Sequence, residues 1–159
     1  PAGVETGTRI QLGGQGEVGP GAGPAGDLYV EIQEVPHPVF HREGDDLNCT
    51  IPIPMTAAAL GTDLTRETLD GEEPITIAPG TQSGARFTLG SRGVPHLRGH
   101  GRGSLYVHIE VKTPMGLDST QRELLEQLAA LRGEEKVDVN PVEQHAGLFG
   151  RLKDAFTGR

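Results

Sequence analysis

The chain has 159 residues, of which 35% are hydrophobic and 4% aromatic, and it carries 14 Lys and Arg against 22 Asp and Glu. This length indicates one or two small domains, and a formal charge of −8 disfavours attachment to nucleic acid or to an anionic membrane surface. The single cysteine cannot form an internal disulfide, and no apolar stretch approaches the ~20 residues of a membrane helix, so we expect a soluble, cytoplasmic protein.

Alternation of apolar and polar residues with period two predicts short β-strands that each have one buried face. Five segments show this alternation: 9–12, 28–32, 47–53, 86–89 and 105–111. In the third segment, Pro52 and Pro54 remove ladder donors, which favours a position at a sheet edge that can accept a partner strand.

Two connections between these strands carry recognisable local signals. Residues 55–60 predict a short helix that Gly61 ends. Residues 69–72 contain Asp70-Gly71, a pair favoured in two-residue hairpin turns. We therefore expect a helical turn and a β-hairpin in the middle of the chain.

After Pro114 the apolar period changes from two to 3.6 residues, which predicts a helix. Asp118 and Gln121 have the spacing of a capping box at its start, and Gly133 ends it. Four leucines share one stripe of this helix: Leu124, Leu125, Leu128 and Leu131. A helix of about 14 residues is marginal in isolation, and burying four leucine side chains contributes roughly 6–12 kcal/mol. We expect a second copy of the chain to cover the stripe; packing against the chain's own sheet is the alternative.

An internal repeat relates the two ends of the β region. An offset of 77 residues aligns positions 1–34 with 78–111 without a gap, and 11 positions are then identical. The matches include Leu-Tyr-Val at 28–30, in a chain with only two tyrosines. This agreement indicates a duplicated domain. The second copy is preceded by residues 35–77 and the first by no comparable segment, so we expect a fragment of a longer protein.

One glycine-rich motif resembles a dinucleotide turn. Residues 14–19 match G-x-G-x-x-G, but the Gly- and Pro-rich residues that follow cannot open the helix that receives a pyrophosphate. We therefore expect no nucleotide site. The paired glycines Gly13/Gly16 and Gly90/Gly93 are interpreted as strand ends that need positive φ.

Metal binding and catalysis find little support. The histidine pairs at 37–41 and 96–100 have a metal-ligand spacing, but both lie in expected loops, and two arginines beside the second pair would repel a cation. Cys49 alone cannot supply the thiolates of a structural zinc site. No serine lies in a G-x-S-x-G elbow. The sequence thus predicts no metal, no other cofactor and no enzymatic activity.

Several motifs resemble the second C-terminal β-domain of DnaJ, the heat-shock co-chaperone family. They are Pro38–Leu47, Ala58–Gly61, Leu69-Asp70-Gly71, Gly80–Gly84, Phe87-x-Leu89, Gly93-Val94-Pro95 and Gly103–Val111. Residues 1–33 resemble the closing part of the first such domain. The resemblance covers about residues 1–132 and accounts for the repeat.

This resemblance implies a mostly β fold. We expect the closing part of a first β-domain (1–34), a complete DnaJ-type β-sandwich (35–112), a C-terminal dimerisation helix (113–133) and a linker with a flexible tail (134–159). The last segment contains a short amphipathic stretch, which is interpreted as a tail rather than as a docking peptide.

The resemblance also implies which residues act. In the family, shallow apolar clefts hold unfolded segments for delivery to a DnaK-type chaperone. By position, the client-binding residues would be Leu28, Val30 and Ile32, with Leu105, Val107 and Ile109 in the second copy. The dimerisation residues would be Leu117, Leu124, Leu125, Leu128 and Leu131.

Departures from the family limit the expected activity. There is no His-Pro-Asp tripeptide and no C-x-x-C-x-G-x-G repeat, so these residues should neither stimulate DnaK nor bind zinc. Ser104 also replaces the aspartate that the first copy has as Asp27. The expected partners are unfolded polypeptides, a second copy of the chain and, through the full-length protein, a DnaK-type chaperone, but not nucleic acid or membranes. The alternative function is a β-rich scaffold that only self-associates.

Overall fold

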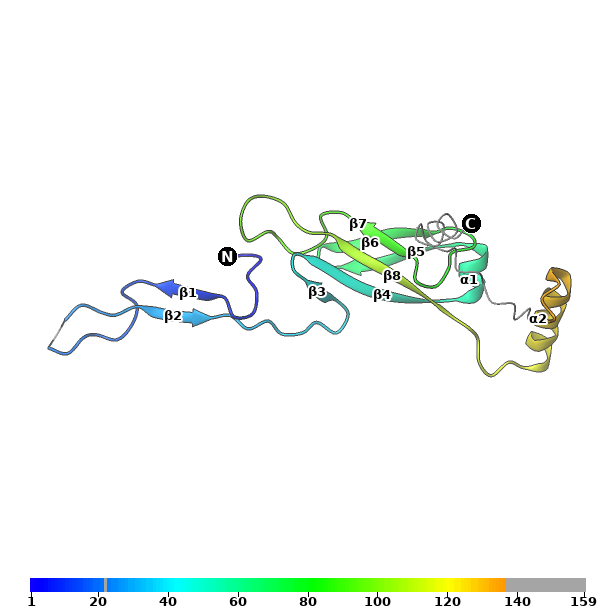
Figure 1. The fold of residues 1–159 in the computed structure, drawn as a ribbon, viewed down its shortest axis with the longest axis horizontal. Coiled ribbons are helices and arrows are strands. Elements are labelled where there is room, and N and C mark those ends of the chain that lie inside the picture. Colours follow the sequence, from blue (N-terminus) through cyan, green and yellow to red (C-terminus); the bar gives the residue numbers. More distant parts are fainter. Residues whose placement is uncertain (22, 137–159) are drawn as a thin grey trace, which may run out of the picture. The chain divides into compact units, whose positions relative to one another are not determined.

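The computed structural model describes residues 1–21 and 23–136, and the chain divides into two compact units, residues 1–114 and the residues from Met115 onward. The elements, labelled in Figure 1, are β1 (Arg9–Leu12), β2 (Leu28–Glu31), β3 (His41–Glu43), β4 (Asp46–Pro54), α1 (Met55–Leu60), β5 (Thr62–Thr68), β6 (Gly71–Ile77), β7 (Arg86–Leu89), β8 (Leu105–Lys112) and α2 (Ser119–Arg132). The predicted mostly β class is confirmed. The amphipathic stretch predicted near the C-terminus lies outside the described residues.

The strands form three sheets. β1 and β2 pair as one antiparallel hairpin, and β5 and β6 pair as another around the predicted Asp70-Gly71 turn. The other strands form a four-stranded sheet in the order β3-β4-β8-β7, in which β4 and β8 run parallel. The short helix predicted before Gly61 is also present, as α1.

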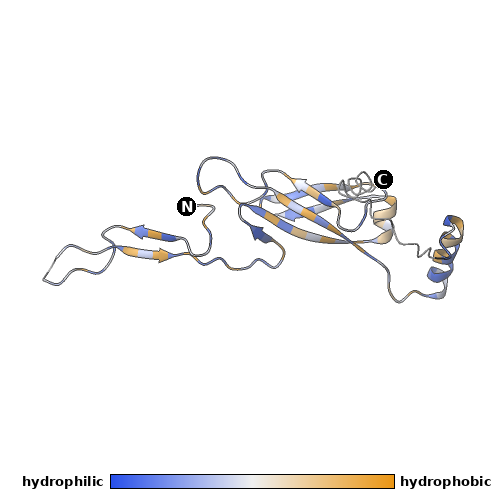
Figure 2. Cartoon of the chain, viewed as in Figure 1, coloured by the Kyte–Doolittle hydropathy of each residue, from blue (hydrophilic) through white to orange (hydrophobic). Residues whose placement is uncertain are grey.

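A single hydrophobic cluster joins the four-stranded sheet, the β5-β6 hairpin and α1 within the second copy of the repeat. Its buried residues are Phe40, Leu47, Cys49, Ile53, Ala58, Ile75, Ile77, Leu105, Val107 and Ile109. Alternate residues of β4 and β8 enter this core, and Figure 2 shows the matching alternation of apolar and polar residues along both strands. The second copy is therefore a β-sandwich with its own core.

Strand β4 is interior at its start and lies at a sheet edge further along. β3 pairs only with the first residues of β4, as far as Asn48, whereas β8 pairs with β4 as far as Pro54. The Leu47 N–H donates to the Ser104 carbonyl before β8 (2.9 Å), so even-numbered residues of β4 turn their backbone groups away from β8. Pro52 and Pro54 therefore lie at positions whose backbone groups point to the open edge, where the N–H that proline lacks would have no strand to bond to. The edge predicted from these prolines is confirmed for the second half of β4.

The two copies of the repeat share one hydrogen-bonding register. Each pair in the β1-β2 ladder has its counterpart 77 positions later in the β7-β8 ladder, as Ile10↔Val30 corresponds to Phe87↔Val107. The isolated bridges that follow β1 and β7 match in the same way. The duplication inferred from residue identities therefore extends to backbone geometry.

The glycines of the repeat act differently from the prediction. None of the four paired glycines has a positive φ: Gly13, Gly16, Gly90 or Gly93. The residues with positive φ at these turns are instead Gly14 (68°) and Ser91 (57°). A Cβ at Gly93 would lie 2.5 Å from the Asp45 carbonyl oxygen. Glycine is required there because another backbone segment occupies the position of a side chain.

Helix α2 begins and ends at the predicted residues. Asp118 Oδ1 accepts the Gln121 N–H (2.7 Å), and Gln121 Oε1 accepts the Asp118 N–H (3.1 Å), which completes the capping box. Gly133 ends the helix in the left-handed conformation (φ 68°). No residue of α2 is buried. Among the described residues, no helix has both the length and the apolar character needed to cross a membrane.

Candidate functional site

Strand β2 presents predicted client-binding residues on its surface. Leu28 is 43% and Val30 38% exposed, and Ile32, just after the strand, is half-buried. The N–H and C=O groups of Ile32 both bond to the segment before β1. Because these groups alternate in direction along a strand, those of Tyr29 and Glu31 point to the edge of β2 that faces away from β1. No strand pairs with that edge in the described residues. β2 therefore offers an open edge beside a partly exposed apolar face.

Strand β8 places the matching residues in the core instead. Leu105, Val107 and Ile109 are 0%, 0% and 2% exposed. Side chains without exposed surface cannot contact a client in this fold, so these three residues are removed from the predicted client site. The difference between the copies has a physical cause: β4 pairs along the whole of β8 and brings its own apolar residues into the shared core, whereas β2 has no equivalent neighbour in the described chain.

An apolar groove lies beside the segment that connects the two copies. It encloses about 560 Å³. Its apolar lining residues are Val35, Pro36, Pro38, Val39, Phe40, Leu47, Leu69 and Val94. Val35 is 89% exposed. Sequence reasoning missed this groove because residues in an irregular connection have no strand or helix period; the available signal was the apolar run Val35-Pro36-x-Pro38-Val39 in a polar neighbourhood.

Arg42, on β3, ties the N-terminal segment to the second domain. Its Nη1 and Nη2 donate to the carbonyl oxygens of Val4 (2.8 Å) and Gly3 (2.9 Å), and its Nε donates to that of Gly44 (2.7 Å). Nη1 also pairs with the Glu34 carboxylate (2.5 Å), and the side chain is only 17% exposed. One side chain thus gathers both ends of the first copy beside the β3-β4 turn.

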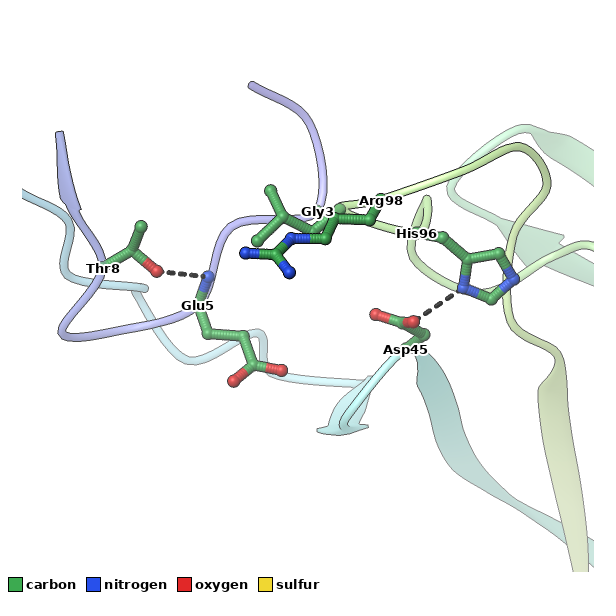
Figure 3. A pocket seen from close by; sticks show the side chains of 7 residues that line it. Gly3, Glu5, Thr8, Asp45, His96 and Arg98 are labelled. Carbon is green, nitrogen blue, oxygen red and sulfur yellow. Dashed lines mark hydrogen bonds and ion pairs between the residues drawn. The ribbon is translucent and has the colours of Figure 1, made fainter.

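A polar pocket of about 470 Å³ lies where the N-terminal segment meets the loop after β7 (Figure 3). Asp45 Oδ2 and His96 Nδ1 face each other at 2.6 Å, and Arg98 lines the same space. Among the lining residues only Thr8 has a hydroxyl, and it accepts the Glu5 N–H (3.2 Å) rather than bonding to the histidine. The contact between Asp45 and His96 joins the β3-β4 turn to the loop after β7.

His37, one of the histidines singled out in the sequence, makes structural contacts. His37 Nδ1 accepts the N–H groups of Val39 (3.1 Å) and Phe40 (3.2 Å), and its ring packs on the Phe40 ring at 5.0 Å. Over residues 1–21 and 23–136, no three His, Cys, Asp or Glu side chains are grouped as metal ligands. His37 therefore shapes the start of the second domain.

The shifted titratable groups also have structural explanations. The Gly14 N–H (3.0 Å) and Gln11 Nε2 (2.5 Å) both donate to the Asp27 carboxylate and hold its pKa below the usual value. Burial raises the pKa of the Cys49 thiol, which keeps it protonated and unreactive. Asp27 closes the turn after β1, and Cys49 belongs to the core.

The leucines assigned to dimerisation lie in the unit that begins at Met115. Leu124, Leu128 and Leu131 are 49–86% exposed, and Leu117 and Leu125 are half-buried. A stripe of exposed leucines on a capped helix is typical of a face that packs against another apolar surface. The α2 stripe is the second candidate interaction surface.

Comparison with known proteins decides the family. The sequence model for the DnaJ C terminal domain matches residues 1–114, and the model for the Chaperone protein DnaJ C-terminal region matches residues 120–158. The chain belongs to the DnaJ C-terminal family. The family inferred from motifs is thereby confirmed. The second match also runs through residues 134–158, where the sequence alone indicated only a linker and a tail.

Full-length DnaJ proteins contain regions similar to the whole of this chain. Those named Chaperone protein DnaJ 2 include proteins from Streptomyces coelicolor (64% identical over 159 residues), Streptomyces avermitilis (63% over 159) and Mycobacterium tuberculosis (54% over 161). Each match covers 100% of this chain and 42% of the relative. The DnaJ C-terminal region described here thus spans less than half the length of these chaperones.

Proposed function

We propose that this DnaJ C-terminal region binds unfolded or non-native polypeptide and self-associates as a homodimer, so that the full-length protein delivers clients to a DnaK-type chaperone. The observation that carries the proposal is apolar surface left exposed at two separate places, the β2 strand with the neighbouring groove and the α2 stripe. Contiguous exposed apolar surface of this kind marks interaction sites. Membership of a chaperone family supports the same conclusion.

For the client, β2 offers both main-chain and side-chain contacts. In the second copy β4 pairs alongside the equivalent strand, and the core that buries the apolar face of that strand also contains residues of β4, β6 and α1. An extended client segment fits the same place on β2, with strand addition at Tyr29 and Glu31 and apolar contact at Leu28 and Val30. Full burial of each of these two apolar side chains contributes roughly 1.5–3 kcal/mol, which suits reversible holding. The groove at Val35 extends the apolar surface along the chain.

Suppression of aggregation tests the client surface. The chain should lower light scattering by a chemically denatured reporter enzyme, and Val30→Asp should weaken that effect because a carboxylate replaces an apolar contact. Val18→Asp is the matched control, since Val18 is a 70% exposed valine in the same hairpin but outside β2. Val35→Asp tests the groove separately. Equal suppression by the Val30 and Val18 variants would remove β2 from the client site.

For self-association, the α2 stripe has enough apolar surface. Burying its four leucines contributes roughly 6–12 kcal/mol, and a micromolar dissociation constant corresponds to about 8 kcal/mol. Part of this gain offsets the loss of translational and rotational freedom. A reversible dimer in the micromolar range is therefore the expected state.

Mass measured by light scattering at micromolar concentration tests the dimer. The double variant Leu125→Asp with Leu128→Asp should be a monomer, because two carboxylates would be buried in an apolar interface. Ala130→Asp places the same group on the opposite side of the helix and should leave the dimer intact. An unchanged mass for the double variant contradicts the assignment. A dimer that never suppresses aggregation would instead indicate the scaffold function.

A further inference from the structure

The leucine stripe of α2 is broader than the seam between two paired helices. At about 100° per residue, Leu124, Leu128 and Leu131 lie within about 60° of one another, and Leu125 lies about 60° further round, on the side of Ala129. No residue of α2 is buried in the part of the chain that the structure describes. Two paired helices need only a narrow apolar seam, whereas a broad stripe faces a larger apolar surface. The proposed dimer covers the three aligned leucines, so the flank at Leu125 and Ala129 has room for another neighbour.

The C-terminal stretch, residues 147–156, lies outside the residues that the structure describes, but its sequence has an apolar face of matching width. Its apolar residues recur with the period of a helix: Leu148, Phe149, Leu152, Ala155 and Phe156. At about 100° per residue this face spans about 120°, as does the α2 stripe. Arg151 and Lys153 lie one on each border of the face. An apolar face of this kind is typical of a segment that docks on another apolar surface.

Three observations connect this stretch to α2. One sequence model, that of the Chaperone protein DnaJ C-terminal region, matches residues 120–158 and so contains both. The charges are complementary: residues 119–135 carry four glutamates and two arginines, a net −2, whereas residues 147–159 carry two arginines and one lysine against one aspartate, a net +2. The connection, residues 134–146, can span at most about 45 Å, and a helix of the length of α2 is about 21 Å long. The stretch can therefore fold back along the helix that precedes it.

We propose that residues 147–156 pack along the Leu125 and Ala129 flank of α2 in the same chain, in place of the free tail expected from the sequence. The inference deepens the proposed function, and it rests on the proposed dimer only for the cover of the other leucines of the stripe. A membrane surface is the alternative for an amphipathic stretch bordered by cations. The joint sequence model and the charge of −8 on the chain favour α2.

NMR of the whole chain, with phenylalanine, leucine and alanine isotope-labelled, tests the contact. The rings of Phe149 and Phe156, two of the four phenylalanines in the chain, should give NOEs to the methyl groups of Leu125 and Ala129. These NOEs should persist when labelled chains are diluted into an excess of unlabelled chains, because the contact lies within one chain. If the chain proves to be a monomer, the proposed dimer fails but the NOEs should remain. The absence of NOEs from both rings to α2, or their loss on dilution, would overturn the proposal.

Two double variants of the C-terminal stretch provide the comparison. Leu152→Asp with Phe156→Asp should accelerate amide exchange in α2 ~10- to 100-fold, as expected when apolar side chains no longer cover the helix. Gly150→Asp with Thr157→Asp adds the same two carboxylates on the opposite side of the stretch and should leave this exchange unchanged. Equal exchange in the two variants would contradict the packing. Capture of the chain by vesicles of anionic phospholipid, with no change of exchange in α2 in either variant, would assign the stretch to a membrane instead.

Discussion

At positions 16 and 93 the backbone of a neighbouring segment occupies the place of a side chain. A Cβ at Gly93 would lie 2.5 Å from both the Asp45 oxygen and the Gly103 carbonyl carbon, and one at Gly16 would lie 2.7 Å from the Asp27 oxygen. Real Cβ atoms do not approach backbone this closely, so the turn must move to admit one. Glycine is required at these two positions because a neighbouring backbone segment approaches closely, and not because φ is positive.

Gly93→Ala should therefore destabilise the second domain by about 1–3 kcal/mol, the usual result of overpacking. Gly90→Ala is the matched control, since nothing lies within 4 Å of a Cβ at Gly90 and its φ is not positive. That variant should be neutral or slightly stabilising, because alanine restricts the unfolded chain. Urea unfolding of both variants measures the difference. Similar midpoints for the two would contradict a backbone clash at Gly93.

Elements whose signals are local could be predicted from the sequence. Alternation located β1, β7 and β8 because each strand has a period of two, and the Asp118–Gln121 spacing located the start of α2 because capping needs only neighbouring residues. Burial depends on the neighbouring strand, which local pattern does not reveal. Leu28 and Leu105 both begin a Leu-Tyr-Val run, yet only β8 has β4 beside it. The groove at Val35 likewise arises from segments brought together by folding.

Helix α2 depends on its caps because none of its residues is buried in the part of the chain that the structure describes. Asp118→Ala removes the acceptor of the Gln121 N–H and should cost about 1 kcal/mol of helix stability. Ser119→Ala, at the next position, removes no capping bond and is the control. Amide exchange across α2 should accelerate only in the Asp118 variant. The same rate in both variants would show that contacts other than the cap hold the helix.

On the scale of the whole first unit, one arginine joins the two copies of the repeat. Arg42 donates to the carbonyl oxygens of Gly3 and Val4 and pairs with Glu34, so it contacts the first copy on both sides of the β1-β2 hairpin. Its own strand, β3, belongs to the four-stranded sheet. A lysine cannot replace it, because one ammonium does not span these acceptors as a guanidinium does.

Arg42→Ala and Arg42→Lys should therefore both release the N-terminal segment while leaving the core of the second domain folded. Amide exchange should accelerate at Thr6 and Gly7, whose N–H groups bond to Glu34 and Ile32, and remain slow in β8. Each charge-assisted hydrogen bond lost contributes roughly 1.5–3 kcal/mol. Arg9→Ala is the control, because Arg9 pairs with Glu31 inside the hairpin at a 72% exposed side chain, where ion pairs contribute little. Unchanged exchange at Thr6 and Gly7 in both Arg42 variants would mean that other contacts hold the first copy in place.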